Sequence, residues 1–329
     1  MIEAKNISIG YKQNGGVAKL LDSASFEFQK GKLYGIIGSN GKGKTSLLQV
    51  LSAYKKPLEG NLSLFGKQYS DYSSYDFSKL ISVVFTERPQ IEFMTVFEFV
   101  SSGRTPHTGF YGSLNKNDLR TISYAMTRCG IAHLKQRKLN TLSDGEYQKA
   151  LIAKSLAQET PIILLDEPAT YLDVSAKIKL MNLLRDLVLS EQKTIIMSTH
   201  DIDLAIKYSD NLLVFNDDKT LEQGTPEDLI LNKRFDMLFS SDDLCFNIEN
   251  GIFETIDTVS PTIKVEGDKI MQKWVLNALS KYPNFCQQNQ FINAKILCHG
   301  DKSLSLIINN QSSQTFESIA EMLTVLQSL

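Results

Sequence analysis

The sequence has no long hydrophobic run and few cysteines. No segment reaches the about 18 consecutive apolar residues of a membrane-spanning helix, and residues 1–5 lack the apolar core of a secretion signal. The 4 cysteines among 329 residues are scattered, which predicts reduced thiols in a cytosolic protein rather than a disulfide framework. The net charge of −2 excludes a globally basic nucleic-acid binder, though not a local basic patch. With 42% apolar and 22% charged residues, the chain has the composition of a soluble globular protein of about two domains.

Apolar residues are spaced in two ways, and each spacing predicts a different kind of sheet. Residues 1–30 alternate apolar and polar side chains, as antiparallel strands with one solvated face do. Fully apolar segments at 34–37, 162–165 and 194–198 alternate with helical segments, which predicts a parallel sheet covered on both faces. Residues from about 86 to 158 have the pattern of helix and loop. The predicted fold class is therefore α/β.

The last part of the chain differs in character, and we place a boundary between residues 258 and 259. Apolar residues around Trp274 predict a helix with Trp274 in the core of this part. Alternation at 292–298 and 304–308 on either side of a turn predicts a hairpin. A second helical stripe is predicted from Phe316 to Leu326. Residues 259–329 are thus expected to form a small α+β domain.

A glycine-rich loop lies between the apolar segment 34–37 and a predicted helix, and it matches G-x-x-x-x-G-K-[ST]. In such a loop backbone N–H groups converge on phosphate oxygens, and the helix N-terminus favours the same anion. Lys44 would supply a positive charge for the β- and γ-phosphates, and Thr45 a hydroxyl ligand for Mg²⁺. The strand-to-helix context disfavours the alternative of a turn that binds nothing. The predicted nucleotide-binding residues here are Gly38, Ser39, Asn40, Gly41, Lys42, Gly43, Lys44, Thr45 and Ser46.

Two carboxylates, Asp166 and Glu167, follow the apolar segment 162–165. The carboxyl end of a buried parallel strand faces the crevice where α/β sheets bind ligands. Asp166 is placed to hold Mg²⁺, usually through water, and Glu167 to orient and deprotonate an attacking water. The alternative is a solvated acidic turn, which the nearby phosphate loop disfavours.

Further segments resemble motifs of the ABC ATPases. Residues 142–146 resemble the LSGGQ signature and stand 20 residues before Asp166. Residues 166–173 resemble the Walker B motif with the D-loop, and 198–201 resemble the switch-histidine motif. The resemblance covers about residues 1–258. It implies a P-loop core made of a mixed sheet with a RecA-like parallel part, an antiparallel β subdomain and a helical subdomain at about 86–158.

The resemblance also implies roles for single residues. Two copies of the chain would form a nucleotide sandwich, in which Ser143 and Gly145 of one copy touch the γ-phosphate of ATP bound to the other. His200 would sense or stabilise the γ-phosphate. Together with Lys44 and Glu167, it is therefore one of the three expected catalytic residues. Tyr11 falls where the family stacks an aromatic ring on adenine. Asp173 would shape the dimer contact, and as a helix N-cap it has an alternative structural role.

One position departs from the family. Thr86 stands where the family usually has a Gln, and its side chain is too short to reach Mg²⁺ as a Gln does. We hypothesise that Glu87, or a water held by Thr86, takes over this role. The alternative for Glu87 is a surface charge.

The segment 96–107 is similar to a stretch of importers for iron chelates, haem and cobalamin, T-V-x-E-x-V followed by G-R-x-P-H. One ATPase unit without a membrane span best fits an importer with separate permease subunits and, indirectly, a substrate-binding protein. Such a subunit lies at the cytoplasmic face of the inner membrane, and no nucleic-acid partner is expected. Within this segment Arg104 and His107 are expected to brace the loop. The alternative is a soluble mechanical ABC ATPase acting on nucleic acid or a protein assembly, and a small-molecule P-loop kinase is disfavoured.

Overall fold

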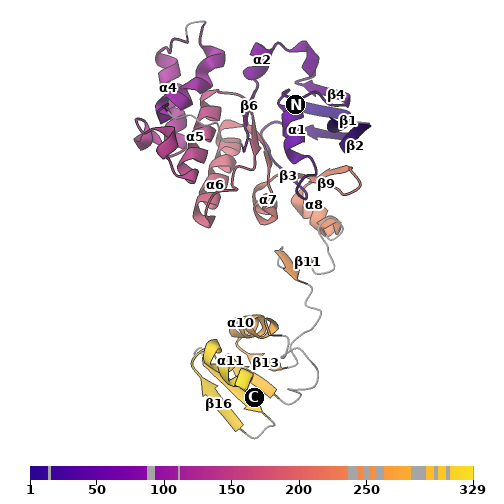
Figure 1. Ribbon diagram of the computed structural model, residues 1–329, viewed down its shortest axis with the longest axis vertical. Helices are drawn as coiled ribbons and strands as arrows, with labels where there is room; N and C mark the ends of the chain where they lie inside the picture. Colours follow the sequence, from indigo (N-terminus) through magenta and orange to yellow (C-terminus); the bar gives the residue numbers. More distant parts are fainter. Residues whose placement is uncertain are drawn as a thin grey trace. The chain divides into compact units, whose positions relative to one another are not determined.

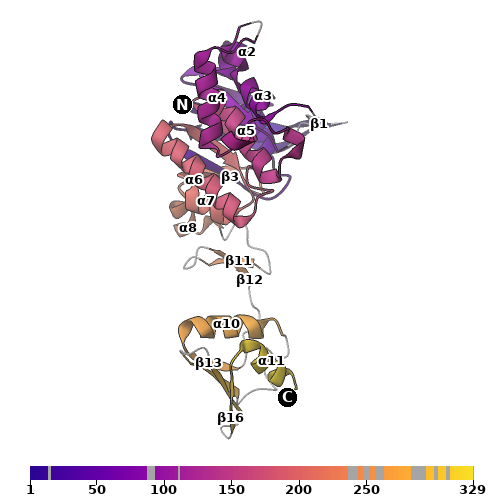
Figure 2. The ribbon, with the colours of Figure 1, turned by 90° about the vertical axis from the view of Figure 1, so that its left-hand side faces the viewer.

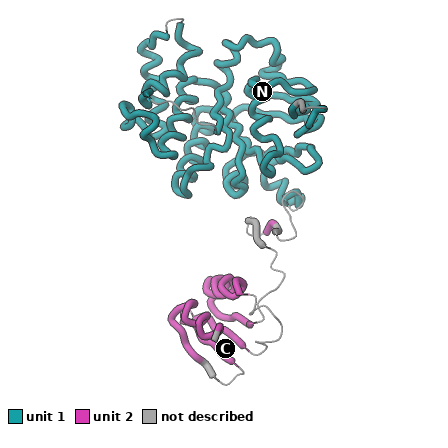
Figure 3. The backbone as a smooth tube through the Cα atoms, viewed as in Figure 1, with its two compact units in different colours: residues 1–239, 248–252 teal, residues 240–247, 253–329 magenta. Residues whose placement is uncertain are grey.

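The computed structural model of the chain describes residues 1–13, 16–86, 93–109, 112–235, 244–247, 252–255, 263–282, 294–299, 303–308 and 312–328 (Figure 1). The chain divides into two compact units (Figure 3). Unit 1 comprises Met1–Phe239 with Ile248–Ile252, and unit 2 comprises Ser240–Asn247 with Phe253–Leu329. Within the ranges that are described, no helix has the length and apolar character needed to cross a membrane.

A six-stranded sheet with the order β10-β9-β3-β8-β7-β6 forms the centre of unit 1. All neighbours pair in parallel except β10, which is antiparallel to β9. The α/β prediction is therefore confirmed. The strands are β3 (Leu33–Ile37), β6 (Ile81–Val84), β7 (Ile162–Asp166), β8 (Thr194–Ser198), β9 (Asn211–Phe215) and β10 (Leu221–Gly224). Helices of this part are α1 (Lys44–Leu51), α6 (Val174–Glu191), α7 (Ile202–Tyr208) and α8 (Pro226–Leu231).

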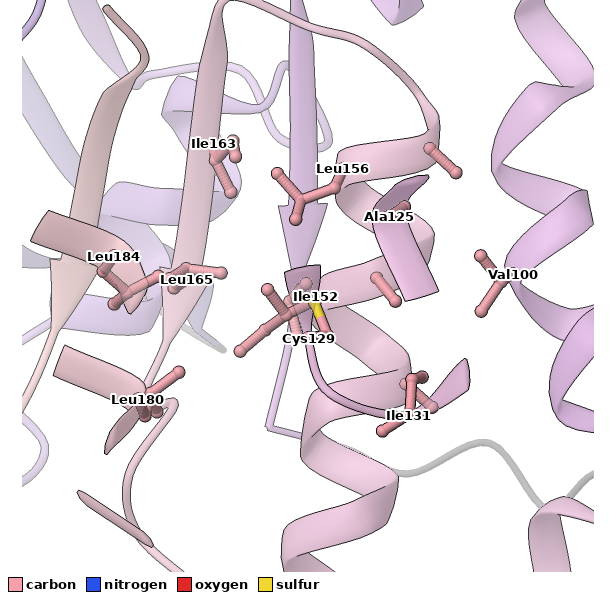
Figure 4. Packing of buried hydrophobic residues seen from close by; sticks show 14 of the residues in the cluster. Val100, Ala125, Cys129, Ile131, Ile152, Leu156, Ile163, Leu165, Leu180 and Leu184 are labelled. Atoms are coloured by element: carbon pink, nitrogen blue, oxygen red, sulfur yellow. The ribbon is translucent and has the colours of Figure 1, made fainter. Parts of the chain in front are cut away.

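Alternate residues of the central strands pack into two different cores, as expected for a sheet covered on both faces. Ile163 and Leu165 of β7 belong to one core, and Figure 4 shows them together with Leu180 and Leu184 of α6 and with Leu156 of α5 (Asp144–Ala157). The intervening residues of β7 belong to the second core, which also contains residues of α1 and of the first strands of the chain. Each residue of β7 is buried as a result. This burial holds β7 in place, and the carboxylates of Asp166 and Glu167 lie at its carboxyl end.

The predicted antiparallel region is a four-stranded sheet with the order β2-β1-β4-β5. Its strands are β1 (Ile2–Gln13), β2 (Gly16–Phe28), β4 (Glu59–Leu64) and β5 (Lys67–Gln68). Strand β1 pairs with β2 in a register that places Ile2 opposite Phe28, and register shifts occur further along the pair. The alternating apolar residues turn to the second core, as the sequence predicts.

Most of the described helices between β4 and β7 fall within the range of about 86–158 that is expected for the helical subdomain. Three of its helices begin with reciprocal capping boxes, in which an N-cap side chain and the residue three positions on satisfy each other's backbone N–H. The helical elements are η1 (Tyr69–Asp71), α2 (Ser74–Ser78), α3 (Val96–Ser101), η2 (Ser102–His107), α4 (Lys116–Arg128), η3 (Ala132–Leu134), η4 (Leu139–Thr141) and α5 (Asp144–Ala157).

Unit 2 contains a four-stranded sheet with the order β13-β14-β15-β16, whose strands β13 and β16 are labelled in Figure 2. It also has its own apolar core. Its two helices, α10 (Lys269–Ser280) and α11 (Ile319–Ser328), contact each other as well as strands of the sheet, so both helices lie on one face of this sheet. Strands β14 and β15 form the predicted hairpin. The elements are β13 (Lys264–Gly267), α10 (Lys269–Ser280), β14 (Ala294–Cys298), β15 (Leu304–Ile308), β16 (Ser312–Phe316) and α11 (Ile319–Ser328). A separate two-stranded sheet joins β11 (Leu244–Asn247) and β12 (Ile252–Thr255).

Two predictions for this unit are wrong. Trp274 is 60% exposed, because α10 turns Val275 and Leu279 toward the sheet and leaves Trp274 on its outer face. Phe316 ends strand β16 and does not begin a helix. Helix α11 starts only after Ser318, whose hydroxyl accepts the N–H of Glu321.

Candidate nucleotide-binding and catalytic site

The glycine-rich loop connects β3 to α1 and is held in a shape that only glycine accommodates well. Gly43 has a φ of +111°, and a Cβ there would lie 3.1 Å from Cβ of Leu20. The ammonium of Lys44 donates to the carbonyl oxygens of Gly38 at 2.7 Å and Ser39 at 3.2 Å, so it lies inside the loop. A phosphate that enters this loop would therefore meet a positive charge already in place.

The residues on the outer side of the loop are more exposed to solvent than Lys44. Lys42 forms an ion pair at 2.6 Å with Asp217, in the turn that follows β9. Ser46 lies in the first turn of α1 and is half-buried. The exposed residues of the loop are Ser39, Asn40 and Gly41.

Thr45 and Asp166 place oxygen atoms side by side at the end of β7. The Thr45 hydroxyl lies 3.1 Å from Oδ1 and 3.0 Å from Oδ2 of Asp166, and Ser198 donates to Oδ1 at 2.6 Å. Burial lowers the pKa of Lys44, while the charges of Glu167 and Asp166 act to raise it. A hydroxyl and a carboxylate beside a phosphate loop are hard oxygen ligands, and they fit a Mg²⁺ ion.

Glu167 follows in an uncommon backbone conformation, with a φ of +48°. Thr170 donates to its Oε2 at 3.0 Å, and Nδ1 of His200 lies 3.5 Å from the same oxygen. The backbone N–H of Glu167 donates to Ser198 Oγ at 2.9 Å. The His200 side chain is 49% exposed, so it is accessible to a ligand. The structure thus brings five predicted residues into one region: Lys44, Thr45, Asp166, Glu167 and His200.

Ser143 is the N-cap of α5, at the start of the segment that resembles the family signature. Its hydroxyl accepts the N–H of Glu146 at 3.3 Å, and its own N–H donates to the Glu146 carboxylate at 2.9 Å. The latter bond lowers the pKa of Glu146. A Cβ at Gly145 would lie 3.4 Å from the side chain of Leu172, so the signature lies against the D-loop within one chain.

The remaining predicted residues lie in different surroundings. Asp173 caps α6 by accepting the N–H of Ala176 at 2.7 Å, and Tyr11 lies in β1 with 49% of its surface exposed.

Glu87 lies outside the described residues. Thr86 donates from its hydroxyl to the backbone carbonyl of Asp166 at 2.9 Å. Within the part of the chain that the structure describes, no hydrogen bond or ion pair joins the phosphate loop to Tyr11, Ser143, Gly145 or Asp173.

Ser198 and Thr170 were not predicted as site residues, yet both hold the carboxylates. Ser198 ends β8 and is directly opposite Asp166 in the parallel pairing of β7 and β8. A hydroxyl at the last position of a neighbouring strand is the sequence feature that could have indicated it. Thr170 lies three residues after Glu167, within the turn that follows the strand.

Arg104 and His107 brace the segment after α3, as expected. Arg104 is 5% exposed, and its Nε lies 2.9 Å from Oδ1 of the buried Asp118. It also donates to the carbonyl of Ala157 at 2.8 Å, and a ring nitrogen of His107 lies 2.8 Å from the carbonyl of Gln158. Both side chains therefore tie this segment to the end of α5.

Comparison with known proteins agrees with this geometry. Residues 21–170 match the ABC transporter family. The chain is 34% identical over 233 residues to the petrobactin import ATP-binding protein FpuD of Bacillus anthracis, covering 70% of this chain and 84% of that protein. It is 32% identical over 238 residues to the ferric enterobactin transport ATP-binding protein FepC of Escherichia coli, covering 72% and 86%. A dimeric structure of a bacterial ABC transporter cassette matches with a TM-score of 0.62 and 25% identity, covering 69% of this chain and 99% of that one.

These matches define the chain as an ATP-binding cassette, with the phosphate loop and carboxylates that such an ATPase requires. The chain belongs to the ABC transporter family as one of its ATP-binding, ATP-hydrolysing proteins.

Proposed function

We propose that this chain hydrolyses MgATP to drive the import of an iron complex through a membrane permease. The observation that carries the ATPase proposal is the cluster of Lys44, Thr45, Asp166, Glu167 and His200 around the phosphate loop. The cargo class is supported by the relatives, which are named for petrobactin import and ferric enterobactin transport. The similarity of 96–107 to iron-chelate importers supports the same class.

The residues divide the work of phosphoryl transfer, which consists mostly of positioning and charge stabilisation. The loop N–H groups and Lys44 bind the phosphates. Thr45 and Asp166 would hold Mg²⁺, which neutralises phosphate charge when it is bound. Glu167 orients the attacking water and takes its proton, and His200 stabilises the γ-phosphate.

A second copy of the chain completes the site. Ser143 and Gly145 of the partner subunit would contact the γ-phosphate, with Asp173 at the contact between copies and Tyr11 against the adenine. The dimeric cassette to which the chain is similar supports this arrangement. The complex would lie at the cytoplasmic face of the inner membrane with permease subunits, and a substrate-binding protein would deliver the cargo. A metal-binding role for Glu87 stays a prediction.

The catalytic assignment is tested by Glu167→Gln. This variant keeps the shape of the side chain and removes its basicity, so we expect it to bind ATP, to hydrolyse it at less than about one hundredth of the normal rate, and to form a stable ATP-bound dimer. Glu227→Gln, an exposed residue at the start of α8, is the matched control and should keep full turnover. Rapid hydrolysis by Glu167→Gln would refute the role.

The transport assignment is tested by purifying the tagged chain from its native membranes in mild detergent. Co-purification of a polytopic permease, and stimulation of ATPase activity by a binding protein loaded with a ferric siderophore, are the expected results. Stimulation by nucleic acid or by a soluble assembly instead would favour the mechanical ATPase and reject the importer.

A further inference from the structure

One peptide group at the catalytic site is held from both sides. The unit that joins Asp166 to Glu167 presents its C=O to one neighbouring strand and its N–H to the other. The C=O accepts the Thr86 hydroxyl at 2.9 Å, and the N–H donates to the Ser198 hydroxyl at 2.9 Å. Thr86 follows β6, and Ser198 ends β8, so the two strands that flank β7 contribute one hydroxyl each.

This peptide group sets the direction in which the Glu167 side chain leaves the backbone. Glu167 has a φ of +48°, a conformation that costs a non-glycine residue free energy and persists only when its surroundings enforce it. Rotation of the Asp166–Glu167 peptide would relieve the strain and would redirect the carboxylate. It would also break the hydrogen bonds to Thr86 and to Ser198.

We propose that Thr86 is a positioning residue, whose hydroxyl holds the Asp166–Glu167 peptide so that Glu167 faces the attacking water. The inference rests on the proposed ATPase function and names a role for the position where the family usually has a Gln. Thr86 acts through the backbone and not through the metal or the water. Its single hydroxyl proton is donated to the Asp166 carbonyl, so it cannot also be donated to the nucleophile.

The parallel pairing of β6 and β7 explains why a short side chain suffices. Val84 lies opposite Leu165, which places Thr86 two residues further along, beside the end of β7. Thr is β-branched and has few rotamers, so little entropy is lost when its hydroxyl is fixed.

The test compares Thr86→Val, which removes the hydroxyl and keeps the shape, with Thr86→Ser, which keeps the hydroxyl. We expect kcat of Thr86→Val to fall by about three- to tenfold, as for the loss of one hydrogen bond, and that of Thr86→Ser to stay within about twofold. The affinity for MgADP and the Mg²⁺ concentration at half-maximal rate should not change in either variant. Normalising kcat to the fraction that binds MgADP removes any effect of incomplete folding.

Thr127→Val is the matched control, because the Thr127 hydroxyl also donates to a backbone carbonyl, that of Ser123, but lies on an exposed face of α4. It should leave kcat unchanged. Three results would overturn the inference: an unchanged kcat in Thr86→Val, an equal loss in Thr86→Ser, or a raised Mg²⁺ requirement, which would give Thr86 a metal-linked role. If the unaltered chain does not hydrolyse MgATP, or Glu167→Gln hydrolyses it normally, the proposed function fails instead.

Discussion

The buried pair of Arg104 and Asp118 allows a quantitative test of how the helical subdomain is held together. Arg104 is 5% exposed and Asp118 is 2% exposed, and their charged groups lie 2.9 Å apart. Arg104→Met fills similar space but leaves the Asp118 carboxylate buried without its cation. Removing one partner of a buried ion pair costs about 3 to 5 kcal/mol. The N–H of Asn115 still binds Asp118, so we expect the lower value, about 3 kcal/mol.

This loss of unfolding free energy is measured by thermal and urea unfolding, monitored with a spectroscopic signal that reports on unit 1. For a unit of this size about 3 kcal/mol corresponds to a fall of about 6 to 12 °C in the melting midpoint. Arg104→Met with Asp118→Asn removes both charges, keeps an oxygen that can accept the N–H of Asn115, and should recover part of the loss. A decrease below about 1 kcal/mol in the single variant, or a further full decrease in the double variant, would refute the reasoning.

The same pair predicts how stability depends on pH. The backbone N–H of Asn115 and the side chain of Arg104 hold the folded-state pKa of Asp118 below its usual value. The stabilisation is therefore present above the unfolded-state pKa of about 3.9, and it is lost as the pH falls through the lower, folded-state pKa. Without Arg104 the folded-state pKa rises, so Arg104→Met should lose stability at a higher pH than the unaltered chain. Acid unfolding at the same pH in both would contradict this.

Three further outcomes are expected. Gly43→Ala should weaken ATP binding strongly, because this position has a φ of +111° and the new Cβ would lie 3.1 Å from Leu20. Gly41→Ala should cost only about 1 kcal/mol of backbone strain, because a Cβ there has no neighbour within 4 Å. Titration with nucleotide compares the affinities of the two variants. Burial raises the pKa of the Cys129 thiol to about 12, so alkylation mapped by mass spectrometry should modify Cys129 at neutral pH only after unfolding. A chain ending at residue 258 should keep its basal ATPase activity, because the core of unit 2 shares no residues with the cores of unit 1; loss of folding would move the boundary.

Local sequence determined much of the site in advance. The phosphate loop and the pair Asp166 and Glu167 lie within strand–turn segments whose residue types are required at fixed spacings, so their roles could be predicted without tertiary contacts. The hydroxyls of Ser198 and Thr86 could not be assigned in this way. Their contacts depend on which strands pair and in what register, and they join residues 32 and 80 positions apart.

Helix α10 shows a second limit of prediction from sequence: a helical pattern with two apolar stripes does not say which stripe faces the core. Ile270 and Trp274 are four residues apart, as are Val275 and Leu279, so each pair forms an apolar stripe on a helix. Only the second pair faces the sheet, and Ile270 and Trp274 are 74% and 60% exposed. Periodicity identifies a helix with two candidate faces, and packing against β13 selects between them.

Strand β6 connects the two halves of the proposed composite site. Past its end, the Thr86 hydroxyl donates to the carbonyl of Asp166, in the peptide that we propose to orient Glu167. In its middle, the buried Ser82 hydroxyl lies 2.6 Å from that of Ser155 in α5. Helix α5 begins after Ser143, which we propose to face the nucleotide of the partner subunit. One short strand and a residue just past it therefore contact both the signature helix, through Ser82, and the end of β7, through Thr86.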